Sequence, residues 1–159
     1  MNAPLQIAAA PVRKSIVVKA PQARAFEVFT ARFASWWPKS HHIGSAEMAE
    51  AIIEPRMGGR WYEKGVDGSE CQWGEVLAWE PPSRLVLSWR INGQFKPDPS
   101  LDSAVEVRFV AEDDDTTRVE LEHRICAVDA EAIRAAVDSP RGWGSLLEVY
   151  AQAAGRQMR

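Results

Sequence analysis

Short strand-like segments separated by turn signals fill the middle of this chain, and they constrain its fold more than any other feature. β-branched and aromatic residues gather in runs between residues 48 and 126. Turn residues separate the runs at Gly58-Gly59, Asp67-Gly68, Pro81-Pro82 and Asp113-Asp114-Asp115. Short turns join antiparallel neighbours. The pattern predicts antiparallel strands at 48–54, 60–64, 71–79, 84–91, 104–111 and 118–126.

Helical segments and one further strand flank this region. Val12–Val18 is a β-branched run that predicts a first strand, and Pro21 then opens a helix, where its missing N–H costs nothing. Asp129 is placed to cap a short helix that ends at Val137. The C-terminal segment predicts a longer helix, because apolar residues recur there at helical spacing: Trp143, Leu146, Leu147, Tyr150, Ala151 and Ala154.

The order of elements favours an α+β architecture. A sheet with one apolar face needs cover, and the C-terminal apolar stripe is the available cover. We therefore expect a twisted antiparallel sheet wrapped around one long helix. The length of 159 residues fits one domain, which we place at 12–159, with 1–11 as a disordered tail.

Composition excludes several classes of protein. The net charge of −3 provides no basic surplus to neutralise phosphates, so no nucleic-acid partner is expected. No apolar run approaches the ~20 residues that span a membrane. The N-terminus lacks the basic region of a signal peptide, so a cytoplasmic location is expected. Cys71 and Cys126 lie far apart and are interpreted as reduced packing residues.

Charges in the last hairpin suggest a register. If Glu112 lies opposite Arg118, each outward-facing pair joins opposite charges, since Arg108 then faces Glu122 and Glu106 faces Arg124. The opposite face of the hairpin carries Val107, Phe109, Val119, Leu121 and His123, and is predicted to point inward.

Two histidine sites have two interpretations each. His123 shares the inward face of its strand, either as a core histidine satisfied by a carbonyl or water, or as a polar group that binds a ligand or moves a proton. His41-His42 lies in a loop beside Trp36-Trp37, either simply exposed or at the rim of a pocket.

Aromatic and acidic residues leave further alternatives open. Seven Trp against two Tyr indicate either an aromatic core or an aromatic-lined pocket. Glu75 points inward as a candidate acid, or outward if Gly74 marks a bulge. Glu54, Glu63 and Arg90 are interpreted as solvated strand positions. No nucleophile elbow, phosphate loop or zinc motif occurs, so nothing demands catalysis, and no metal or cofactor is expected.

A family resemblance covers the chain from Val12 to Tyr150. Its markers, each short, follow one another in a specific order: Ala20-Pro21, Ala25-Phe26, Phe29, Trp36-Trp37-Pro38, Glu54-Pro55-Arg56, Gly58-Gly59-Arg60, Asp67-Gly68, Trp73-Gly74-Glu75-Val76, Glu80-Pro81-Pro82, Arg84-Leu85, Thr117-Arg118-Val119, Glu122-His123 and Gly142-Trp143. With these residues the chain resembles the SRPBCC (START/Bet v1-like) superfamily, in the branch of the activator of Hsp90 ATPase homologues.

The resemblance implies a helix-grip fold with a cavity between the sheet and the last helix. Relatives bind lipids, hormones or polyketides, and some are cyclases or aromatases. It therefore implies a small hydrophobic ligand, lipid-like or aromatic. The candidate ligand-binding residues are Trp37, Trp61, Trp73, Trp89, Phe109, His123, Trp143 and Leu147.

Two alternatives to a binding protein remain. One is a cyclase or aromatase-like enzyme that uses His123, with Glu75 as its only plausible companion. The other is a chaperone-interacting module, which predicts an exposed apolar patch at Trp36-Trp37.

Overall fold

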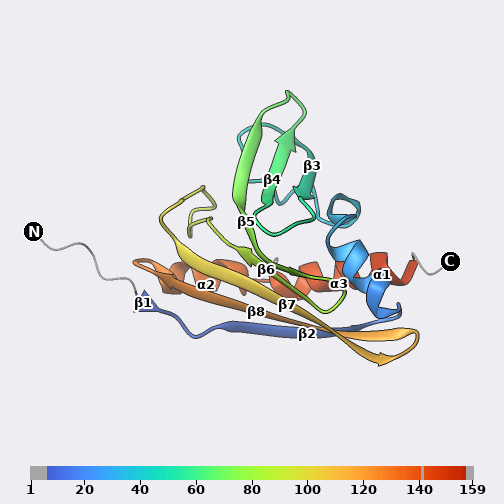
Figure 1. Cartoon of the computed structure of the whole chain (residues 1–159). Helices are drawn as coiled ribbons and strands as arrows, with labels where there is room; N and C mark the ends of the chain where they lie inside the picture. The colour runs from blue at the N-terminus through green and yellow to red at the C-terminus, as the bar shows by residue number, and fades with distance from the viewer. Residues whose placement is uncertain (1–6, 141, 157–159) are drawn as a thin grey trace, which may run out of the picture.

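One antiparallel sheet organises the molecule (Figure 1). The computed structural model describes residues 7–140 and 142–156. Within these ranges the strand order is β1-β8-β7-β6-β5-β4-β3, with β2 also paired to β8. The strands are β1 (Ile7–Ala8), β2 (Val12–Val18), β3 (Met48–Ile53), β4 (Arg60–Gly65), β5 (Glu70–Glu80), β6 (Arg84–Ser88), β7 (Asp102–Asp113) and β8 (Thr116–Ala127).

Helix α3 (Trp143–Arg156) runs along one face of this sheet. Helix α1 (Gln22–Phe29) lies across the C-terminal half of α3 (Figure 1). The Tyr150 hydroxyl of α3 donates a hydrogen bond to the Ala25 carbonyl of α1, at 2.6 Å. Ring edges of Phe29 meet Phe109 and Tyr150 between the two layers. The predicted α+β helix-grip fold is confirmed.

Two shorter helical elements complete the fold. A 3-10 turn, η1 (Phe33–Ser35), follows α1, and α2 (Ala130–Val137) precedes α3. The predicted strand at 84–91 is shorter in the structure, because β6 ends at Ser88. Beyond that point single backbone hydrogen bonds remain, from the Trp89 N–H to the Ser103 carbonyl of β7 and from the Arg90 N–H to the Trp73 carbonyl of β5, each at 2.8 Å.

The predicted disordered tail is partly wrong. Residues 1–6 of it lie outside the described residues. Ile7 and Ala8 form β1, opposite Ala127 and Cys126 of β8. The N–H of the buried Ala9 then donates to the Ile125 carbonyl at 3.0 Å. These backbone bonds order the segment, and no apolar periodicity in so short a strand could have revealed them.

The predicted register of the β7–β8 hairpin is also wrong. Arg108 lies opposite Glu120, and Glu106 opposite Glu122, two residues away from the predicted pairing. A bulge between Ala111 and Asp113 shifts the register near the turn. Because a shift of two keeps every side chain on its face, the inward-facing set is buried as predicted: Val107, Phe109, Val119, Leu121 and His123.

Glu106 escapes repulsion from Glu122 because three arginines surround it. Arg84 from β6 donates at 2.6 Å and Arg124 at 2.9 Å, while Arg108 lies 3.0 Å away. The Glu106 side chain is only 10% exposed. The hydrogen bond from Arg84 lowers the pKa of Glu106 most, followed by the hydrogen bond from Arg124 and the positive charges of Arg108 and Arg84. Together they bring it from 4.5 to about 2.

Within the described ranges, none of the helices is long and apolar enough to cross a membrane.

We expect Glu106→Gln to lower the free energy of unfolding at pH 7 by about 2–3 kcal/mol. The folded pKa is depressed, so this stabilisation is present above pH 4.5 and is lost as the pH falls from about 4.5 toward 2. Urea unfolding at several pH values measures it. Glu120→Gln, on a carboxylate that is 45% exposed, is the control and should change little. Equal effects of the two variants would contradict the stabilising role given to Glu106.

Candidate ligand-binding pocket

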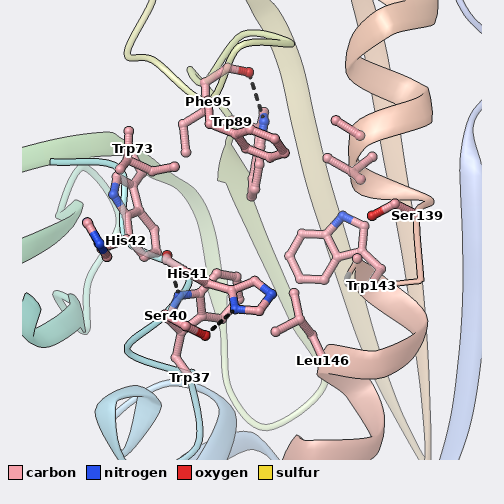
Figure 2. Close-up of a pocket in the computed structure, with 15 residues that line it drawn as sticks. Trp37, Ser40, His41, His42, Trp73, Trp89, Phe95, Ser139, Trp143 and Leu146 are labelled. Atoms are coloured by element: carbon pink, nitrogen blue, oxygen red, sulfur yellow. Dashed lines mark hydrogen bonds between the residues drawn. The ribbon is translucent and has the colours of Figure 1, made fainter. Parts of the chain in front are cut away.

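A pocket of about 380 Å³ opens between the loop after Trp37, the strand β5, the segment that follows β6, and the α2–α3 junction (Figure 2). This volume is within the range of small-molecule sites, roughly 300–1,000 Å³. Its walls are mainly apolar, formed by Trp37, Ile43, Trp73, Trp89, Ile91, Phe95, Ala136, Val137, Trp143 and Leu146. Polar side chains reach it from Ser40, His41, His42 and Ser139.

The indole N–H groups of the four wall tryptophans all donate hydrogen bonds within the protein. Trp37 donates to the His41 carbonyl at 3.2 Å and Trp89 to the Ile91 carbonyl at 3.0 Å. Trp73 donates to the Glu63 carboxylate, and Trp143 to His123, each at 3.0 Å. With every N–H engaged, these side chains offer a ligand only the carbon edges and π faces of their rings.

These four rings also support one another. Trp37 lies 5.4 Å from Trp73 and 6.1 Å from Trp143, measured between ring centroids. Trp89 and Trp143 are 5.6 Å apart. Such edge and tilted contacts stabilise aromatic pairs beyond their buried area. The wall is therefore built before any ligand arrives, which limits the entropy lost on binding.

His123 lies behind the wall and does not line the pocket. It is fully buried, and its Nδ1 accepts the hydrogen bond from Trp143. Nε2 therefore carries the proton and donates to the Ser103 hydroxyl oxygen at 2.9 Å. Burial, with a contribution from the Arg124 charge, lowers the pKa of His123 to about 3. His123 is therefore a neutral core histidine, and its role is to position Trp143.

The remaining predicted site residues divide in two. Trp37, Trp73, Trp89 and Trp143 line the pocket. Trp61, Phe109 and Leu147 are buried elsewhere. Trp61 backs the wall, 5.4 Å from Trp73, whereas Phe109 packs against Phe26 under α1. All seven are buried, but burial does not distinguish core from pocket.

The loop after Trp37 supplies residues that the sequence indicated only as a possible rim. His41 is half-buried and His42 exposed, and both line the pocket. Trp36 and Trp37 are buried, so the predicted exposed apolar patch is absent. Phe95, Ala136, Val137, Ser139 and Leu146 were missed, because no local pattern brings the segment after β6 next to α2.

Glu63 fixes that loop, and its interpretation as a solvated residue is wrong. The side chain is buried, and its carboxylate accepts hydrogen bonds from the Ile43 and Gly44 backbone N–H groups and from Trp73. One carboxylate thus ties the loop to the sheet and orients a wall ring. Charge-assisted bonds of this kind are stronger than those between neutral groups.

Glu75 points outward, the alternative that a bulge at Gly74 predicts. The register of β4 and β5 shifts beside Gly74, and Glu75 lies 3.7 Å from Arg90 at a side-chain exposure of 45%. A Cβ on Gly74 would stand 1.9 Å from the Ser88 carbonyl oxygen, so only glycine fits. Glu75 therefore supplies no acid to the pocket.

Metal ligands do not converge here. Among the described residues, no group of three or more His, Cys, Asp or Glu side chains is placed to hold a metal ion.

An antiparallel sheet closed by a long helix, with a hollow at one end of the interface, defines a helix-grip domain of the SRPBCC superfamily. The profile of the family described as "Activator of Hsp90 ATPase homolog 1-like protein" matches residues 19–154. The chain belongs to this family.

Solved structures resemble the chain over most of its length. The anthrahydroquino-gamma-pyrone synthase Txn09, complexed with SUM, is 42% identical, with 91% of this chain and 96% of that chain covered and a TM-score of 0.61. The self-sacrificing resistance protein CalC from Micromonospora echinospora is 32% identical, with 92% and 95% covered and a TM-score of 0.71.

An Hsp90 activator from Plasmodium falciparum, PFC0360w, shares the fold. It is 20% identical, with 74% of each chain covered and a TM-score of 0.51. No curated protein matches the chain.

Replacing Glu63 with Gln should release the pocket loop. The Ile43, Gly44 and Trp73 N–H groups all donate to one oxygen of Glu63, Oε1. A Gln oxygen can take that place but carries no negative charge, so these hydrogen bonds weaken, and we expect a loss of about 1–2 kcal/mol in stability. Amide hydrogen exchange at Ile43 and Gly44 should accelerate. Glu50→Gln, on the exposed part of β3, is the matched control. Unchanged exchange in Glu63→Gln would contradict this role.

His123 should stay neutral over a wide pH range. We expect its imidazole NMR resonances to hold constant from pH 8 to about 4, with the proton on Nε2, because the folded pKa is about 3. Below pH 6.5 the unfolded imidazole takes up a proton that the folded one does not. The stability that the folded state gains from a neutral His123 is therefore lost as the pH falls from 6.5 toward 3. A titration midpoint near 6.5 would refute the sealed environment.

Proposed function

We propose that this protein binds a planar, polycyclic aromatic molecule in the pocket of Figure 2. The observation that carries the proposal is the wall of four indoles whose N–H groups are all engaged in hydrogen bonds within the protein. Such a wall has no donor for a polar ligand surface and recognises flat apolar rings by stacking. A flexible lipid chain would gain no comparable directional contact.

Polar groups gather where a hydroxyl or carbonyl edge of such a ligand would lie. Figure 2 shows Ser40 and His41 at one end of the pocket, with Phe95 and Trp89 at the other. A few polar groups in an otherwise apolar site fix the orientation of a ligand. The proposed ligand is thus a fused-ring aromatic that carries oxygen at one edge. The name of the 42% identical synthase, which refers to such a ring system, agrees with this class.

A pocket-filling substitution tests the proposal. Ala136 on α2 lines the pocket, whereas its neighbour Ala135 is exposed and does not. We expect Ala136→Phe to weaken binding of anthraquinone-2-sulfonate, a soluble three-ring probe, at least about tenfold by calorimetry, because the new ring occupies the site. Ala135→Phe should bind within about twofold of the wild type. No saturable binding by the wild type, or equal affinities of the two variants, would sink the proposal.

A second candidate is ring closure on the bound molecule, as the name of the 42% identical synthase suggests. His41 would carry it, since His41 lines the pocket and the sealed His123 does not. The His41 imidazole would take the proton of a phenol, whose oxygen attacks the β-carbon of a conjugated enone. The π electrons move to the carbonyl, and the α-carbon takes the proton back. No other reactant is needed.

The conversion of 2′-hydroxychalcone to flavanone tests this chemistry. If His41 is the base, the wild type should accelerate ring closure about a hundredfold over buffer. His41→Gln should lose that acceleration while it still binds anthraquinone-2-sulfonate. Equal rates in the two proteins would leave binding as the proposed function.

A chaperone contact would need a surface other than the buried Trp36-Trp37 pair.

A further inference from the structure

Phe95 departs from the pattern of the other aromatic residues. Its side chain is 52% exposed, although it lines the pocket. Its backbone φ is +59°, in the left-handed region that bulky residues avoid. Four of the five phenylalanines pack against other rings, at positions 26, 29, 33 and 109. Among the ring contacts of the described residues, none involves Phe95.

The loop holds Phe95 in this conformation by several hydrogen bonds. The Asn92 carbonyl accepts from the Phe95 N–H at 3.0 Å, and the Asn92 N–H donates to the Lys96 carbonyl at 2.9 Å. The Asn92 side-chain oxygen accepts from the Gln94 and Lys96 N–H groups. A bridge between Ile91 and Pro97 closes the base of the loop. A closed loop of this kind fixes the backbone from which the Phe95 side chain projects.

The same loop is docked on α2, across the pocket from the sheet. The Gly93 N–H lies 3.5 Å from the Asp129 carboxylate, at the start of α2. A Cβ on Gly93 would stand 3.1 Å from the Ala132 Cβ, so the backbone is already in close contact with the helix. Phe95 is thereby held at one end of the pocket, beside Trp89 (Figure 2).

We propose that Phe95 is a specificity-determining residue that selects ligands long enough to reach from the indole wall to the pocket's outer end. This proposal rests on the proposed function. Hydrogen bonds of the loop hold the strained backbone, but the exposed Phe95 ring makes none of the ring contacts found among the described residues. A bound aromatic would supply that contact, because its outer ring would pack on Phe95 and cover it. A shorter ligand, held among Trp37, Trp73 and Trp143, would not reach it.

Two probes that differ only in length, and three variants, test this inference by calorimetry. Anthraquinone-2-sulfonate has three fused rings and naphthalene-2-sulfonate has two, with the same anionic group. Phe95→Asn removes the ring but accepts positive φ, so it should fold with a melting midpoint equal to or above that of the wild type. Phe95→Leu keeps apolar bulk without the π face. Met57→Asn, at a residue 73% exposed outside the pocket, is the control.

We expect Phe95→Asn to bind the three-ring probe at least about tenfold more weakly and the two-ring probe within about twofold, with Phe95→Leu between them. Met57→Asn should match the wild type. If the wild type binds both probes and Phe95→Asn binds each of them as tightly as the wild type does, the role of Phe95 is overturned and the proposed function stands. A lowered melting midpoint for Phe95→Asn, with unchanged binding, also overturns it. If the wild type binds neither probe, both proposals fall.

Discussion

Hydrogen bonds that engage the four indole N–H groups are the interactions on which this pocket depends. A buried indole needs an acceptor, and here each acceptor comes from a different element: β8 through His123, β4 through Glu63, and two loop carbonyls. These bonds fix the ring planes and leave only carbon facing the hollow. The same bonds tie the strands, the pocket loop and α3 to one another, so ring orientation and tertiary structure are set together.

The two kinds of histidine illustrate how burial divides roles within one site. His123 is fully enclosed, neutral, and bonded at both ring nitrogens, so it supports a wall residue and exchanges no proton. His41 lies on a loop at the open side, where a ligand can reach it. Glu63 is buried like His123 but acts on the loop that carries His41. Its carboxylate binds the loop backbone and does not contact a ligand. The proposed ring closure therefore rests on the loop residue His41.

The outer face of the sheet follows a different principle. There Glu106 and Glu122 lie opposite one another, and arginines from β2, β6, β7 and β8 surround them. The network satisfies the acidic groups internally, which is why the polar hollow beside it, lined by Arg13, Glu106 and Glu122, is not the favoured site. Hairpin charges considered alone predicted the wrong register, because the neighbouring strands also contribute charges.

The sequence by itself determined the architecture. Strand-like runs, turn residues and the apolar stripe from Trp143 to Ala154 define which face of each element is buried, and burial of those faces leaves few ways to assemble them. Only the tertiary structure decided which buried rings border a hollow. Trp61 and Trp73 share the inward face of the sheet, yet one backs the wall and the other lines it. Periodicity reports the direction of a side chain, whereas a cavity depends on how loops and helices far apart in sequence meet above it.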